Sequence, residues 1–230
     1  MRLSIICTCI GLLLTTACHR IDSHHIPTHA VEADIVVDSH DGMTTDITAT
    51  LRLRDEPMTY LQLGPTERLV ATVGAYSEPM YQGMYSYTAS LPQYNDEELV
   101  RVSYLRNHHP SAGASEVIMP SAFELNLYEE HGFNSDTLIV EWDTITHDPM
   151  EIELSGPCIY SQNHLVDGIE SGGALFIDSL TFRTLPSWNG QICPVDITVT
   201  RSRIGQLDRS LWGGSMTASQ TRTATFDLYY

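Results

Sequence analysis

The stretch that decides the fold is DITATLRLR, residues 46–54. Apolar and polar residues alternate through it, with Ile47, Ala49, Leu51 and Leu53 against Thr48, Thr50, Arg52 and Arg54. Side chains two residues apart lie on the same face of a β-strand. The alternation therefore predicts a strand with one buried face and one solvated face.

Short runs of this kind, separated by turn residues, recur along the chain. They cover residues 33–37, 69–73, 98–106, 121–127, 138–142, 150–154, 174–182, 192–200 and 217–228. No segment of ten or more residues has a convincing amphipathic helical pattern. Regularly spaced short strands of this type predict an all-β fold and favour a β-sandwich.

A Pro-, Gly- and Ser-rich break, NHHPSAGAS at residues 107–115, divides the strand pattern. It predicts two small sandwich units, residues 31–113 and residues 114–230. The alternative is one sandwich in which this break is a long loop.

The second half carries a resemblance to a known fold family. The stretch SAFELN…SDTLIVEWD, residues 121–143, resembles the first two strands of fibronectin type III and related immunoglobulin-like sandwiches. The resemblance implies that Trp142 fills the core of this unit. About 25 residues carry the match, and many β-sandwiches share this pattern.

The first residues have the pattern of a secretory signal. Arg2 is the only charge before Cys18, and an apolar run from Ile5 to Leu14 precedes the small residues Thr16 and Ala17. The run is too short to span a bilayer, which takes about 20 residues. We therefore expect residues 1–17 to be a signal peptide.

LTTAC, residues 14–18, resembles a bacterial lipobox, although Leu14 stands one position early. The resemblance implies lipidation of Cys18, and His19 in place of Asp implies the outer membrane. The alternative is an ordinary signal peptide with a chance cysteine. With its strand-rich body, the chain resembles proteobacterial envelope lipoproteins, a likeness that implies no activity. Residues 18–30, polar and rich in histidine, are predicted to be a tether; metal binding by these histidines is the alternative.

Cysteine positions agree with export. Cys7 and Cys9 lie in the signal peptide and Cys18 is the lipidation candidate, which leaves Cys158 and Cys193. Two remaining cysteines in an oxidising compartment predict one disulfide. Two separate buried thiols are the alternative.

The charge of the chain excludes some partners. It has 12 basic residues, all arginine, against 29 acidic ones, and its net charge is −17. This disfavours nucleic acid and electrostatic adhesion to anionic lipid. Arg201, Arg203 and Arg209 form one basic patch, which we interpret as solvated or salt-bridged to the acidic half.

No motif of a serine hydrolase, zinc protease, phosphate loop or dinucleotide site is present. We therefore expect a lipid-anchored envelope protein with a non-catalytic binding or structural-interaction role, its partner an envelope protein or a glycan. The alternatives are a carbohydrate-binding or carbohydrate-active module and a calcium-stabilised adhesin.

Tyrosines supply the first candidate site. Tyr76, Tyr81, Tyr85 and Tyr87 crowd one stretch that also contains Met and Gly. Exposed tyrosines could stack on sugar rings or fill a protein interface. Packing in the core and along an edge strand is the alternative.

Carboxylates supply two further candidates. Asp38, Asp41 and Asp46 cluster between two predicted strands, where calcium binding competes with a plain Asp-Gly hairpin turn. A second group of acids flanks Trp142: Glu141, Asp143, Asp148, Glu151 and Glu153. Paired carboxylates run glycoside hydrolysis, but alternating acids on a strand more often form its solvated face.

Overall fold

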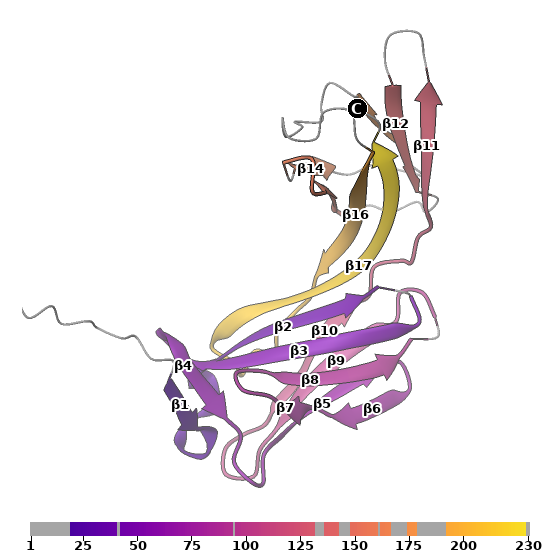
Figure 1. The fold of residues 1–230 in the computed structure, drawn as a ribbon. Helices are drawn as coiled ribbons and strands as arrows, with labels where there is room; N and C mark the ends of the chain where they lie inside the picture. The colour runs from indigo at the N-terminus through magenta and orange to yellow at the C-terminus, as the bar shows by residue number, and fades with distance from the viewer. Residues whose placement is uncertain are drawn as a thin grey trace, which may run out of the picture.

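The structure is a computed structural model that describes residues 19–40, 42–93, 95–131, 136–142, 148–160, 162–166, 174–178 and 192–228 (Figure 1). Its strands are β1 His19–Asp22, β2 Val31–Ser39, β3 Thr44–Leu53, β4 Glu56–Gln62, β5 Arg68–Val73, β6 Tyr76–Pro79, β7 Tyr81–Gln82, β8 Tyr87–Pro92, β9 Leu99–Leu105, β10 Ala112–Ile118, β11 Leu125–His131, β12 Asp136–Trp142, β13 Met150–Ser155, β14 Gln162–Val166, β15 Ala174–Asp178, β16 Cys193–Ile204 and β17 Gly213–Leu228. Two short 3-10 helices, η1 Ser23–His25 and η2 Thr28–Ala30, lie between β1 and β2. Within these ranges, no helix has the length and apolar character to cross a bilayer.

The strands form three sheets. A ten-stranded sheet has the order β1-β4-β3-β2-β17-β16-β13-β14, with β8 beside β3 and β7 beside β8. A four-stranded sheet has the order β10-β9-β5-β6, and a three-stranded sheet the order β11-β12-β15. The smaller sheets pack against different parts of the large one, so the prediction of an all-β sandwich fold is confirmed.

The first core lies between the ten-stranded and four-stranded sheets. β3 contributes Ile47, Ala49 and Leu51, each at most 2 % exposed, while Leu69 and Val102 face them from β5 and β9. The inward and outward residues of β3 are those that its alternation predicts, because one face of the strand packs on a core and the other meets water.

The second core lies between the three-stranded sheet and the β13–β16 region of the large sheet. Val140 and Trp142 from β12 pack in it with Ile152 and Ile197, and Trp142 is 3 % exposed. The expectation that Trp142 fills this core is therefore confirmed. In Figure 1, β17 runs from the first half of the molecule to the second. Met216 near its start belongs to the first core, and Phe226 near its end packs against the second.

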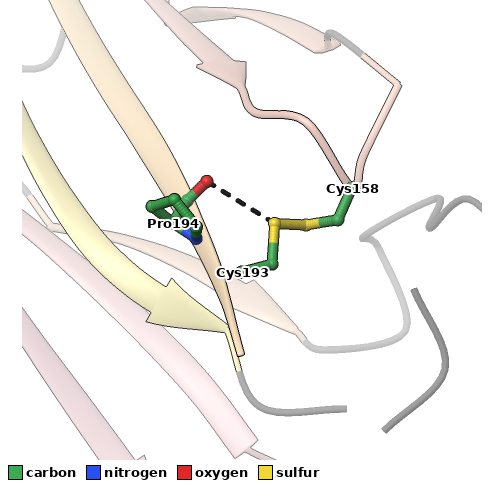
Figure 2. Close-up of a disulfide and its surroundings, with 3 residues drawn as sticks. All are labelled: Cys158, Cys193 and Pro194. Carbon is green, nitrogen blue, oxygen red and sulfur yellow. Dashed lines mark hydrogen bonds between the residues drawn. A yellow bond between two sulfur atoms is a disulfide. The ribbon is translucent and has the colours of Figure 1, made fainter. Parts of the chain in front are cut away.

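The predicted disulfide is present. Cys158 and Cys193 are bridged with their Cα atoms 6.2 Å apart, and both are buried in the second core. Figure 2 shows the bridge, with the Cys193 sulfur 3.5 Å from the carbonyl oxygen of Pro194 at the start of β16. The bridge closes a loop with a sequence separation of 35 residues, which the chain-entropy model values at roughly 3.5–4 kcal/mol.

The N-terminal segment differs from the predicted tether. Cys18 lies outside the described residues, but residues 19–30 are folded onto the body. β1 pairs in parallel with β4, and Ile21 and Ile26 pack against the first core. The polar sequence of residues 19–30 does not indicate this packing. Only two apolar side chains anchor the segment to the core, and a buried polar network holds the remaining residues.

That network centres on an ion pair between Glu67 and Arg106, both with fully buried side chains and 2.7 Å apart. Arg106 also donates to the carbonyl oxygen of Ser23 at 2.6 Å and to the hydroxyl of Thr28 at 3.0 Å. The Ser23 hydroxyl donates in turn to Glu67. A buried charge pair is tolerated only with such additional hydrogen bonds, so the pair and the N-terminal segment stabilise each other.

The chain leaves the first core later than the predicted break at residues 107–115. β10 begins at Ala112 and pairs with β9, which makes the break a hairpin turn within the four-stranded sheet. Met119 still belongs to the first core and Phe123 to the second. The crossing is therefore residues 119–123, and a boundary at 113/114 falls inside a strand.

Three arginines hold this crossing, and we call them the arginine clamp. Their guanidinium groups donate to alternate carbonyl oxygens: Arg203 to Met119 at 3.3 Å, Arg201 to Ser121 at 2.9 Å and Arg222 to Phe123 at 3.1 Å. Arg203 also forms an ion pair with Asp148 at 2.7 Å, which agrees with the salt-bridge interpretation of the basic patch. Arg201, in contrast, is fully buried.

Candidate functional site

The hairpin of β7 and β8 carries Tyr81, Tyr85 and Tyr87, whereas Tyr76 lies on β6, and the hairpin is fastened at both ends. Met80, just before β7, is buried and donates its backbone N–H to Leu69 at 2.9 Å. Tyr87, at the start of β8, is 3 % exposed. Its hydroxyl donates to the Leu61 carbonyl oxygen at 3.0 Å and accepts from the Leu63 N–H at 2.9 Å. The hairpin therefore offers a fixed platform.

The predicted tyrosines divide into two kinds. Tyr81 is 69 % exposed, and Tyr76 and Tyr85 are also exposed. Tyr87 is buried and therefore serves as an anchor rather than a contact residue; burial raises the pKa of its hydroxyl, which stays protonated. The Tyr85 ring lies 4.9 Å from the Tyr60 ring of β4, so these two support each other.

Tyr81 is one of the residues that line an open groove on the outer side of the ten-stranded sheet. The groove has a volume of about 380 Å³ and is lined by Asp46, Ile47, Thr48, Glu78, Tyr81, Thr88, Ala89 and Ser90. Strand register explains why these residues meet. Thr88 of β8 lies opposite both Tyr81 of β7 and Thr48 of β3.

Two carboxylates also line the groove, and the same register accounts for one of them. Ser90 lies opposite Asp46, and Glu78 reaches the groove from β6. Two separate predictions from the sequence, the tyrosine stretch and the aspartate cluster, thus meet at one site through Tyr81 and Asp46. The groove combines an exposed ring, two carboxylates and three hydroxyls.

The aspartate cluster is only partly described. Asp38 and Asp46 lie opposite each other on β2 and β3, and Asp38 accepts a hydrogen bond from the Ser219 hydroxyl. Asp41 lies outside the described residues. Among the residues that are described, no three His, Cys, Asp or Glu side chains are placed to hold a metal ion. Calcium binding here stays a prediction.

The acids around Trp142 do not share one face. Glu141 of β12 lies on the three-stranded sheet, on the side away from the buried Val140 and Trp142. Glu151 and Glu153 are on the exposed side of β13, in the ten-stranded sheet. Asp148 is engaged by Arg203, and Asp143 lies outside the described residues. Glu141, Glu151 and Glu153 therefore match the solvated-face interpretation, whereas Asp148 is held in an ion pair.

Some residues of interest escaped the sequence analysis. Glu78, Thr88 and Ser90 line the groove, yet only the alternation of Tyr87, Ala89 and Leu91 could have indicated that Thr88 and Ser90 face outward. A contact between Trp212 and Arg54 is a second surface feature that the sequence does not indicate. Trp212 is 48 % exposed, and the Arg54 guanidinium lies 3.2 Å above its ring. No local signal links residues so far apart.

Comparison with known proteins adds little to this picture. No family model matches the chain, and no curated protein matches it. Among solved structures, the chain is similar to a cytokine receptor complex, with 12 % sequence identity over 85 % of this chain and 96 % of that chain, at a TM-score of 0.36. A likeness at that level of superposition carries no argument about what this protein does.

Proposed function

We propose that this chain is a non-catalytic binding protein of the bacterial envelope and that its ligand is a glycan. The observation that carries the proposal is that the exposed Tyr81 lines a groove together with hydroxyls and carboxylates. An aromatic ring can stack on the apolar face of a sugar ring. Hydroxyl and carboxylate oxygens beside it can accept hydrogen bonds from the sugar hydroxyls.

The shape of the groove supports binding in preference to turnover. Its volume, about 380 Å³, is at the small end of the range for ligand sites, roughly 300–1,000 Å³. Asp46 is exposed, as is Glu78, and the groove is open to solvent. Electrostatic catalysis depends on a preorganised site from which water is excluded, so these acids suit recognition of hydroxyl groups.

The binding test is calorimetric titration of the full-length processed protein with a panel of neutral oligosaccharides. Tyr81→Ala should abolish binding by removing the stacking surface. The matched control is Tyr128→Ala, because Tyr128 is a half-exposed tyrosine on β11 in the other half of the molecule. Equal affinities of the Tyr81→Ala variant and the parent protein would refute the proposal.

We further propose that Cys18 carries a lipid anchor and that the anchor holds the protein at the outer membrane. Since β1 begins at His19 and pairs with β4, such an anchor would hold the body directly at the membrane, without a free linker. Cys18→Ala should abolish fatty-acid labelling and release the protein into the soluble fraction. Membrane attachment that survives this substitution would point to a different anchor.

A further inference from the structure

The groove has an uneven charge. Asp46 and Glu78 both line it, and Asp38 lies directly opposite Asp46 on the neighbouring strand. Among its described lining residues there is no arginine or histidine. The chain contains no lysine at all, and its net charge is −17. A ligand in the groove therefore meets carboxylates and hydroxyls but no cationic side chain.

The side chains that line the groove would interact differently with acidic, neutral and amino-bearing glycans. A sugar with carboxylate, sulfate or phosphate groups would bring like charges together without a compensating cation, which disfavours binding. A neutral sugar can use the Tyr81 ring and the hydroxyls. A sugar with a free amino group can do the same and also donate charge-assisted hydrogen bonds to the carboxylates, which are stronger than neutral ones.

We propose that the groove selects glycans that carry free amino groups, such as deacetylated hexosamine chains. In this arrangement Tyr81 stacks on a sugar ring, and Asp46 and Glu78 accept hydrogen bonds from its ammonium groups. The two carboxylates come from separate strands, β3 and β6, so they can contact different parts of the ligand. This inference rests on the glycan-binding function proposed above.

The test compares three hexasaccharides: one of glucosamine, one of N-acetylglucosamine and one of galacturonic acid. They are titrated into the full-length processed protein at mildly acidic pH and physiological ionic strength. The glucosamine chain should bind about tenfold more tightly than the acetylated chain, the difference expected between charged and neutral hydrogen bonds. The galacturonic acid chain should not bind.

Variants separate recognition in the groove from general attraction to an acidic protein. The double variant Asp46→Asn/Glu78→Gln should bind the glucosamine and N-acetylglucosamine chains equally. Its control, Glu151→Gln/Asp227→Asn, makes the same change in net charge at exposed positions of β13 and β17 in the other half. This control should keep the preference. Tyr81→Ala should abolish binding of both chains.

Each contrary outcome has a distinct meaning. Equal or tighter binding of the acetylated chain by the parent protein would overturn the amino-sugar inference and leave glycan binding standing. The amino-sugar inference would also be overturned if Tyr81→Ala bound the glucosamine chain as tightly as the parent protein does. The same holds if the control double variant lost the preference for the glucosamine chain. In either case the attraction between the amino sugar and the protein would be non-specific. Failure of every neutral and amino sugar to bind would overturn both proposals.

Discussion

At the scale of single residues, Glu67 and Arg106 have the largest consequences for stability. Burial acts to raise the pKa of Glu67, but hydrogen bonds from Ser23 and Arg106 outweigh it and leave the pKa below its ordinary value. The carboxylate is therefore ionised at neutral pH beside a buried guanidinium. Loss of either partner leaves the other as an unpaired charge in the protein interior.

We predict that Glu67→Gln lowers the free energy of unfolding by about 3–5 kcal/mol, the usual cost of breaking a buried ion pair. Urea denaturation measures this. The matched control is Glu116→Gln, which removes the partner of Arg101 in a pair that is 47 % and 45 % exposed. An exposed pair of this kind contributes below about 1 kcal/mol. Equal losses in the two variants would contradict the role of burial.

The same pair predicts how stability depends on pH. Because the pKa of Glu67 is lower in the folded chain, its contribution is fully present above the ordinary value of 4.5. That contribution is lost as the pH falls through the folded pKa, since the unfolded state then binds the proton more readily. As the pH is lowered from neutral to acidic, the urea midpoint of denaturation should therefore fall more steeply in the parent protein than in Glu67→Gln. Parallel curves would exclude Glu67 as a source of the acid sensitivity.

At the scale of elements, the β7–β8 hairpin links the core to the candidate site. Buried Tyr87 fastens the hairpin through hydrogen bonds to Leu61 of β4 and to Leu63 just after it, while Tyr81 is exposed. Tyr87→Phe leaves the Leu61 carbonyl and the Leu63 N–H without this partner. We expect a loss of about 1–3 kcal/mol in unfolding free energy and weaker ligand binding, because the platform under Tyr81 becomes less fixed.

Thermal melting and amide hydrogen exchange at Leu63 measure this effect. Tyr85→Phe serves as the control, because the Tyr85 side chain is 41 % exposed and its hydroxyl can be replaced by water. That variant should differ from the parent by no more than about 0.5 kcal/mol. Unchanged exchange at Leu63 in Tyr87→Phe would show that the hairpin does not depend on the hydroxyl.

At the scale of the whole molecule, the two cores share structure. β17 contributes to both, and the arginine clamp holds residues 119–123 between them. Because the ten-stranded sheet is continuous from one half to the other, destabilising the second core should also lower the stability of the first. The disulfide, which lies entirely in the second core, offers a way to measure this coupling.

We predict that the double variant Cys158→Ala/Cys193→Ala loses about 3–4 kcal/mol of stability, the loop-closure contribution of the bridge. Hydrogen exchange in β12 and β16 reports on the second core, and hydrogen exchange in β3 and β9 reports on the first. Both probes should shift together. An unfolding transition of the second core alone, with exchange in β3 unchanged, would show that the two halves are independent.

The sequence by itself determined the class of the fold and one covalent link. Alternation in stretches such as residues 46–54 depends only on the period of two in a strand, so it can be recognised locally. The Cys158–Cys193 bridge was predicted from the parity of cysteines, on the expectation that the chain is exported. The burial of Trp142 was also expected, as what the resemblance of residues 121–143 to immunoglobulin-like sandwiches implies.

Only the tertiary structure decided the rest. The register of β3, β8 and β7 brings Asp46 and Tyr81 to one groove, and Glu78 reaches it from β6 of the four-stranded sheet. Register and packing between distant strands leave no local mark in a sequence. Residues 19–30 have the polar composition of a tether, yet they fold onto the body because Arg106 and Glu67 satisfy their buried polar groups. Local patterns report which face of an element is buried, whereas partners across the molecule are set by how the elements pack together.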